Sequence, residues 1–136
     1  MNYENLILKK ASIVEAEEIE KLESISFPAD EAASLSSIKY RLTHAAEYFY
    51  TLSSIDNGNI IGFVNGTCCQ EECVLHESMT HHVEGGSSLV IHSVTMDPTY
   101  RRSGFGMKIL KDYLQLILMN KRNWAEYLSF RMLHIH

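Results

Sequence analysis

The sequence has few long apolar stretches and few cysteines, and each scarcity excludes a class of protein. No apolar run is long enough to cross a bilayer, and the first residues, MNYENLILKKAS, lack the apolar core of a signal peptide. Of only three cysteines, two are adjacent at Cys68 and Cys69, which is no disulfide framework. We therefore expect a cytoplasmic protein, with the nucleus as the alternative location, that has reduced thiols and no membrane association.

Positive charge is also scarce. The chain has 12 lysines and arginines against 17 aspartates and glutamates, a net charge of −5. A nucleic-acid-binding protein normally carries a basic face, so we expect no nucleic-acid partner. A cationic substrate is compatible with the charge, although a surplus of this size is also normal for solubility.

What is present is the patterning of one mixed α/β (α+β) domain over residues 1–136, without internal repeats. Hydrophobic periodicity and turn residues predict the element order β-α-α-β-β-β-α-β. The strands are expected over 5–10, 47–55, 60–69, 89–96 and 127–134, and the helices over 12–24, 34–46 and 106–120. Hairpins supply an antiparallel half of the sheet, and the closing strand-helix-strand unit supplies a parallel pair.

The stretch from Leu89 to Asn120 organises the rest of the chain. It begins as an apolar strand, breaks at Asp97-Pro98, and continues as a helix after the loop Arg101-Arg102-Ser103-Gly104-Phe105-Gly106. The first amides of a helix have no partner within it and favour an anion, while glycines allow a phosphate to approach closely. Neither a P-loop nor a dinucleotide fingerprint fits, because the Lys-Ser/Thr ending and the third glycine are missing.

This loop resembles the acetyl-CoA signature of the GNAT acetyltransferases, Arg/Gln-x-x-Gly-x-Gly/Ala after a strand that ends in an apolar-Asp/His-Pro turn. Within that superfamily the chain is most similar to the arylalkylamine (serotonin) N-acetyltransferases. Three stretches carry this similarity: 27–34 with 38–41, 70–86 with His76-Glu77-Ser78-Met79, and the loop itself. The resemblance implies a GNAT acyl-CoA acyltransferase fold and acetyl-CoA as cosubstrate.

Carried over by position, the resemblance implies two groups of cofactor-binding residues. Val94 and Met96 would offer backbone amides to the thioester and the pantetheine arm. The pyrophosphate would lie against Arg101, Arg102, Ser103, Gly104, Phe105, Gly106 and Met107. A neutral primary amine would then attack the thioester carbon, and an amide donor would stabilise the developing oxyanion.

The amine must first lose a proton, because an alkylammonium has a pKa near roughly 10. The resembling family uses two histidines two residues apart, of which this chain has His92 while Val90 occupies the other position. His92 is therefore the candidate general base. The alternative is a histidine packed and hydrogen-bonded in the core.

Contacts with the amine are expected from the turn that contains Phe27 and Pro28, where the ring could clamp an aromatic or methylene chain. In the alternative, Phe27 packs the first two helices together. Asp30 or Glu31 could pair with a protonated amine, but capping the second helix is the expected duty of either.

The chain departs from the family pattern at its C-terminus. The helix that carries the family's tyrosine general acid and the two terminal strands would lie beyond residue 136, so the resemblance implies a domain truncated there. Either a second copy covers the open sheet in a homodimer, or catalysis is impaired.

Two other functions remain open, and a third, metal binding, is disfavoured. Losing the acid and the terminal strands would suit a non-catalytic acetyl-CoA-binding or oligomerising module. The acceptor could instead be a protein or peptide, rather than an arylalkylamine or a polyamine. A metal site from Cys68, Cys69, Cys73, His76, His81 and His82 matches no standard spacing, so we expect no metal.

Overall fold

The computed structural model describes residues 3–69, 81–86, 88–120 and 129–132 of the chain. Its centre is a five-stranded sheet in the order β1-β2-β3-β4-β5, formed by β1 (Leu6–Lys10), β2 (Phe49–Ser54), β3 (Ile60–Cys69), β4 (Ser88–Met96) and β5 (Ser129–Met132). The pairs β1–β2, β2–β3 and β3–β4 are antiparallel, and β5 pairs parallel with β4. The predicted mixed sheet and its order are confirmed.

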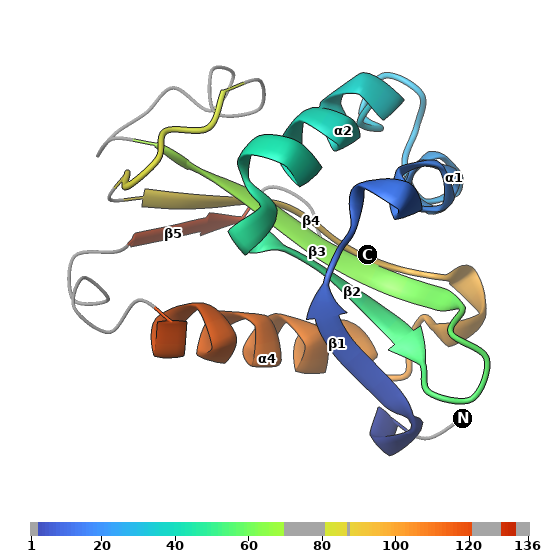
Figure 1. Cartoon of the computed structure of the whole chain (residues 1–136). Coiled ribbons are helices and arrows are strands. Elements are labelled where there is room, and N and C mark those ends of the chain that lie inside the picture. The colour runs from blue at the N-terminus through green and yellow to red at the C-terminus, as the bar shows by residue number, and fades with distance from the viewer. Residues whose placement is uncertain (1–2, 70–80, 87, 121–128, 133–136) are drawn as a thin grey trace.

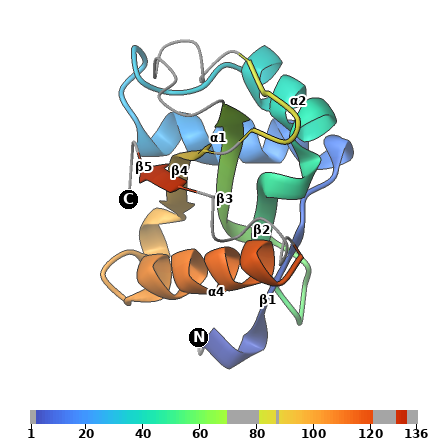
Figure 2. The ribbon, with the colours of Figure 1, turned by 90° about the vertical axis from the view of Figure 1, so that its left-hand side faces the viewer.

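Helices cover both faces of this sheet (Figures 1 and 2). The helices α1 (Ala16–Ser26) and α2 (Leu35–His44) lie on one face, and α4 (Phe105–Asn120) lies on the other. Single 3-10 turns η1 (Tyr3–Asn5), η2 (Ile13–Glu15), η3 (Ala46–Tyr48) and η4 (Pro98–Tyr100) complete the described elements. Among the described helices, none is long and apolar enough to span a membrane.

Capping side chains begin the turn η2, which leads directly into α1, and the helix α2. Ser12 and Glu15 form a capping box: the Ser12 hydroxyl accepts the Val14 N–H and the Glu15 carboxylate accepts the Ser12 N–H at 2.7 Å. The expectation that Asp30 or Glu31 caps α2 is wrong. Ser34 is the residue that does so, because its hydroxyl accepts the Ser37 N–H at 3.2 Å.

The two faces of the sheet differ in chemistry. The α4 face packs an apolar cluster whose sheet residues include Tyr50, Leu52, Val64, Cys68, Leu89, Ile91, Val94 and Met96. The α1/α2 face carries Phe49 and Phe63, but also buried polar residues: Thr51, Asn65, Thr67, His92, Ser93 and Thr95. One face is thus a dry core, and the other holds polar groups beneath the helices.

A β-bulge interrupts the pairing of β3 with β4. Asn65 pairs with Ser93, but Gly66 pairs with Ile91, so His92 is the extra residue on β4. A Cβ added to Gly66 would lie only 2.7 Å from the Val90 carbonyl oxygen. Gly66 thus lies both at the bulge and at a close approach of the two strands.

Candidate functional site

The bulge gives β4 an unusual arrangement of side chains around His92. His92 and Ser93 follow one another and yet lie on the same face, because His92 contacts Thr67 and Ser93 contacts Asn65 on the α1/α2 side. The side chains of Val94 and Met96 belong to the apolar cluster on the α4 side. Regular alternation would have placed His92 on the same face as Val94.

The backbone amides of Val94 and Met96 point to an open strand edge. The Asp97 N–H donates to the Ile61 carbonyl of β3 at 2.7 Å. Because successive amides of a strand point to opposite edges, those of Met96 and Val94 point away from β3. Described pairing between β4 and β5 covers Ser88 to Ile91 only, so these two amides face a stretch of edge with no paired strand in the described chain.

The loop after β4 begins with a left-handed backbone and ends at the start of α4. Arg102 has φ 65° and Gly104 has φ 83°. The Ser103 hydroxyl accepts the Phe105 N–H at 3.3 Å, and the Gly104 carbonyl accepts the Lys108 N–H at 3.3 Å. The amides of Gly106 and Met107, in the first turn of α4, have no acceptor within the helix and can donate to an anion.

The two arginines of the loop have different roles in the structure. Arg101 is half-buried, and its Nη2 donates to the Ser26 hydroxyl at the end of α1 at 2.9 Å. Arg102 is exposed. The Arg101 side chain thus anchors the loop to α1, while Arg102 carries its charge in solvent next to the start of α4.

His92 is buried, with 3% of its surface exposed. Its Nε2 lies 2.9 Å from the Thr67 hydroxyl on β3, and either atom is the donor depending on the tautomer. The hydroxyl partner fixes the orientation of the ring. This geometry suits a general base that acts through water, and it also suits the packed core histidine that the sequence left as the alternative.

Sequence reasoning did not find the polar residues that lie next to the bulge. Arg41 of α2 donates from Nη1 to Asn65 Oδ1 at 3.0 Å, and Asn65 Nδ2 donates to Ser93 Oγ at 2.8 Å. Burial lowers the pKa of Arg41 to about 10, and the charge of Glu23 opposes that shift. The signal available in the sequence is that Arg41 lies at helical spacing from Ile38 and next to Leu42, two apolar residues that share one face of the helix.

The predicted amine-binding turn is only partly exposed. Phe27 is buried at the end of α1, and its N–H donates to the Glu23 carbonyl at 3.1 Å, whereas Pro28 is exposed. Glu23 in turn accepts the Ala33 N–H at 2.8 Å, which closes the turn. Much of the second predicted amine-site stretch, residues 70–80, lies outside the described residues.

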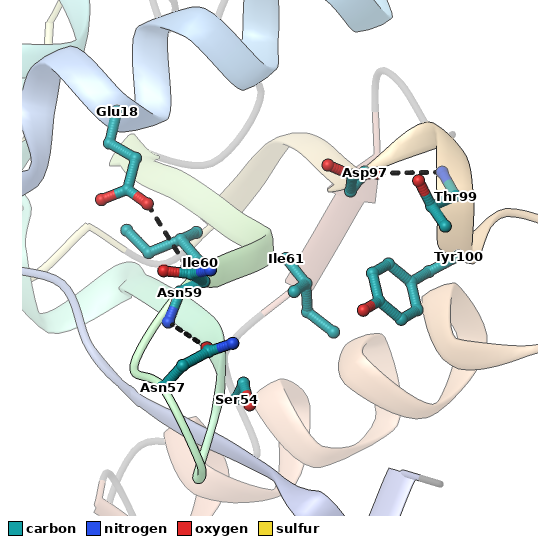
Figure 3. Close-up of a pocket in the computed structure, with 9 residues that line it drawn as sticks. All are labelled: Glu18, Ser54, Asn57, Asn59, Ile60, Ile61, Asp97, Thr99 and Tyr100. Carbon is teal, nitrogen blue, oxygen red and sulfur yellow. Dashed lines mark hydrogen bonds between the residues drawn. The ribbon is translucent and has the colours of Figure 1, made fainter. Parts of the chain in front are cut away.

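A pocket of about 460 Å³ opens at the end of the sheet where β4 ends (Figure 3). Its lining combines two carboxylates, two amides, hydroxyls and isoleucines: Glu18, Asp97, Asn57, Asn59, Ser54, Thr99, Tyr100, Ile60 and Ile61. Glu18 comes from α1, Asn57 and Asn59 come from the β2–β3 turn, and Asp97 to Tyr100 precede the loop. None of the predicted site residues lines this pocket.

The cysteines differ from the sequence expectation in one respect. Cys68 is buried and outside any disulfide, but Cys69 is disulfide-bonded, so the expectation of reduced thiols is wrong for Cys69. His82 accepts the Cys68 N–H at 2.9 Å and pairs with Glu84 at 3.2 Å. Cys73 and His76 lie outside the described residues, and in the described part no group of three ligating side chains could hold a metal.

Three comparisons with known proteins agree with this geometry. Serotonin N-acetyltransferase from Mesocricetus auratus is 30% identical over 97 residues, which are 71% of this chain and 46% of that protein. The chain thus spans about half the length of this relative. The GphF GNAT-like decarboxylase, solved with isobutyryl-CoA, has a TM-score of 0.72 at 21% identity, over 81% of this chain and 58% of that one.

The YhbS GNAT family N-acetyltransferase from Escherichia coli, solved with CoA, has a TM-score of 0.62 at 16% identity, over 86% of this chain and 58% of that one. These structural likenesses confirm the predicted fold. A model of the acetyltransferase (GNAT) family matches residues 16–122, which contain the bulged strand and the glycine loop. The chain therefore belongs to the acetyltransferase (GNAT) family.

Proposed function

We propose that this chain is an acetyl-CoA-dependent N-acetyltransferase domain that transfers an acetyl group to a small primary amine, an arylalkylamine or a polyamine. The observation that carries the proposal is the division of β4 at its bulge. Two backbone amides, Val94 and Met96, point to an open edge beside the glycine loop, while His92 points to the polar α1/α2 face. The cosubstrate and the amine then approach one strand from different directions.

The described residues fit acetyl-CoA in two places. The exposed Arg102, the left-handed Gly104 and the amides of Gly106 and Met107 form a cationic start of a helix, which suits a pyrophosphate. The amides of Val94 and Met96 would hold the pantetheine arm and polarise the thioester carbonyl, an oxyanion-hole arrangement. When bound, acetyl-CoA supplies the activated acyl group.

His92 would supply the proton acceptor on the amine side. A primary amine arrives mostly protonated at neutral pH, so only deprotonation makes its nitrogen a nucleophile. The buried ring of His92, fixed by Thr67, would remove this proton through an ordered water. Phe27 and Pro28 would contact the apolar part of the amine, and the Arg101–Ser26 hydrogen bond ties that turn to the glycine loop.

The burial of His92 supports a second candidate, an acetyl-CoA-binding module without turnover. An assay of thiol release with tryptamine, phenethylamine and spermidine, run alongside calorimetric titration with acetyl-CoA, separates the two. Binding with turnover of at least one amine supports the acetyltransferase. Binding without turnover of any of the three supports the module, and absence of binding contradicts both.

The same proposal includes a homodimer and a cytoplasmic location. In the described chain β5 is the outer strand on the C-terminal side of the sheet, and a second copy would cover that edge. Light scattering of the purified chain should give twice the mass of 15.5 kDa. A monomer at high protein concentration would contradict the dimer without affecting the catalytic proposal.

A further inference from the structure

The bulge of β4 lies beside a chain of three buried polar side chains. Asn65 and Ser93 form the last regular pair before the register shifts, and their side chains are joined by the 2.8 Å hydrogen bond. Arg41 of α2 holds the other end of the Asn65 amide at 3.0 Å. The chain therefore runs from α2 through β3 to the strand position that directly follows His92.

These groups are isolated from solvent. The exposed fractions of Arg41, Asn65 and Ser93 are 4%, 1% and 2%. In such surroundings a hydrogen bond is strong, and a polar group that loses its partner cannot turn to water. The buried amide of Asn65 is therefore satisfied only when Ser93 stands opposite it.

The register that this contact selects has chemical consequences. Gly66 offers no side chain to fix the pairing on the other side of the bulge. If the bulge moved past Ser93, that residue would turn to the opposite face, because a shift of one residue inverts the side-chain alternation. His92 would stay on its face, but the hydroxyl would leave Asn65, and the kink that re-aims the following amides would move toward Val94.

We propose that Arg41, Asn65 and Ser93 fix the position of the β4 bulge and are positioning residues for acyl transfer. The hydrogen bond between Asn65 and Ser93 forms in one strand register only, and Arg41 fixes the orientation of the Asn65 amide. The bulge then holds the Val94 and Met96 amides at the open edge and His92 on the α1/α2 face. The catalytic part of this inference rests on the proposed function, whereas the structural part does not.

The test compares Asn65→Leu, Asn65→Asp and Ser93→Ala with the wild type. Asn65→Leu removes both hydrogen bonds, and Ser93→Ala removes only the second. Asn65→Asp keeps an acceptor for Arg41 and for the Ser93 hydroxyl. Thr51→Val is the control, because Thr51 is buried on the same face and its hydroxyl has no hydrogen-bond partner in the described chain.

Two readouts separate positioning from folding. The backbone amide resonances of 92–96 report the bulge directly, and titration with CoA reports the amides at the edge. Asn65→Leu and Ser93→Ala should shift these resonances and weaken CoA binding by about tenfold or more, as expected for loss of a buried hydrogen bond. Asn65→Asp and Thr51→Val should stay within about threefold of the wild type. In the turnover assay, Asn65→Leu and Ser93→Ala should lower kcat by a larger factor than they change the KM for the amine.

Each outcome decides one question. Unchanged resonances and CoA affinity in folded Ser93→Ala overturn the inference, also where Asn65→Leu fails to fold. Loss of affinity in Thr51→Val as large as in Ser93→Ala also overturns it, because any polar-to-apolar change would then suffice. If the wild type turns over no amine but Ser93→Ala shifts the resonances and the CoA affinity, the bulge assignment stands and only the proposed reaction fails.

Discussion

At the scale of single residues, the pairing of His92 with Thr67 is the contact on which the proposed chemistry depends. A histidine that merely packs in the core contributes through its volume and its hydrogen bond. A histidine that accepts a proton contributes most at pH values where the amine is still protonated. The two roles therefore differ in how the loss of the imidazole depends on pH.

Replacing His92 by glutamine should lower kcat/KM by roughly 10²-fold or more at neutral pH. Glutamine retains a hydrogen-bonding partner for Thr67 but does not titrate. The loss should shrink as the pH approaches the amine pKa of roughly 10, where the amine deprotonates without help. A pH profile with phenethylamine measures this, and an equal loss at every pH would show that His92 has only a packing role.

A second prediction at this scale concerns the left-handed glycine of the loop. Gly104 has φ 83°, and an added Cβ would meet nothing within 4 Å, so Gly104→Ala is strained only through its backbone. Gly58 of the β2–β3 turn has the same character, with φ 75° and open space. Both variants should lose about 1 kcal/mol of unfolding free energy.

Only Gly104→Ala should also weaken CoA binding, because only its backbone lies in the proposed pyrophosphate loop. Urea unfolding gives the first quantity and calorimetric titration gives the second. Equal CoA affinity in the two variants would place the pyrophosphate elsewhere.

At the scale of elements, features that depend on neighbouring residues could be predicted from the sequence, and features that depend on contacts between distant residues could not. The capping box at Ser12 and the turn at Asn57-Gly58 depend only on residues that are close in sequence. The strand β3 has the predicted bounds of Ile60 and Cys69. The bulge was not placed, because its position depends on which β4 residue faces Asn65, a choice made across 28 residues of sequence. The same reason hid Arg41, which appears as an ordinary helix residue until its partner on β3 is known.

The capping box gives a prediction for α1. Ser12→Ala removes the acceptor of the Val14 N–H and should lower the unfolding free energy by about 1 kcal/mol. CoA affinity should not change, because the box lies at the opposite end of α1 from Ser26 and the loop. Thermal unfolding with and without CoA measures both effects. A change in CoA affinity without a change in stability would show that the start of α1 has another role.

At the scale of the whole molecule, the dry face of the sheet contains most of the tyrosines with perturbed pKa values. Tyr48, Tyr50 and Tyr113 belong to the α4-face cluster, and Tyr3 packs against it. Burial is the main cause that raises the pKa of all four, and for Tyr3 the hydrogen bond to Asp112 adds to it. Tyr113 also donates to the Tyr48 carbonyl at 2.7 Å, which joins α4 to the sheet.

These tyrosines predict unfolding at alkaline pH. A phenol with a higher pKa in the folded state ionises first in the unfolded chain, so stability is complete below the ordinary pKa of 10.0 and is lost as the pH rises toward the folded-state values. A phenol that is protonated in the folded chain and ionised in the unfolded chain contributes a slope of at most about 1.4 kcal/mol per pH unit. Arg41 opposes them, because its pKa is lowered to about 10 and the folded chain releases that proton first, but it is one group against four.

Urea unfolding across this pH range should therefore show stability falling above pH 10.0, with phenolate absorbance appearing together with unfolding. Tyr113→Phe should reduce the slope by one tyrosine and lower the stability at neutral pH, since the hydrogen bond to Tyr48 is lost. Phenolate absorbance that precedes unfolding would mean that the α4 face admits water. The loss of stability begins near the pKa of the amine. The pH profiles that test His92 should therefore be measured below that pH, where the sheet and its bulge are intact.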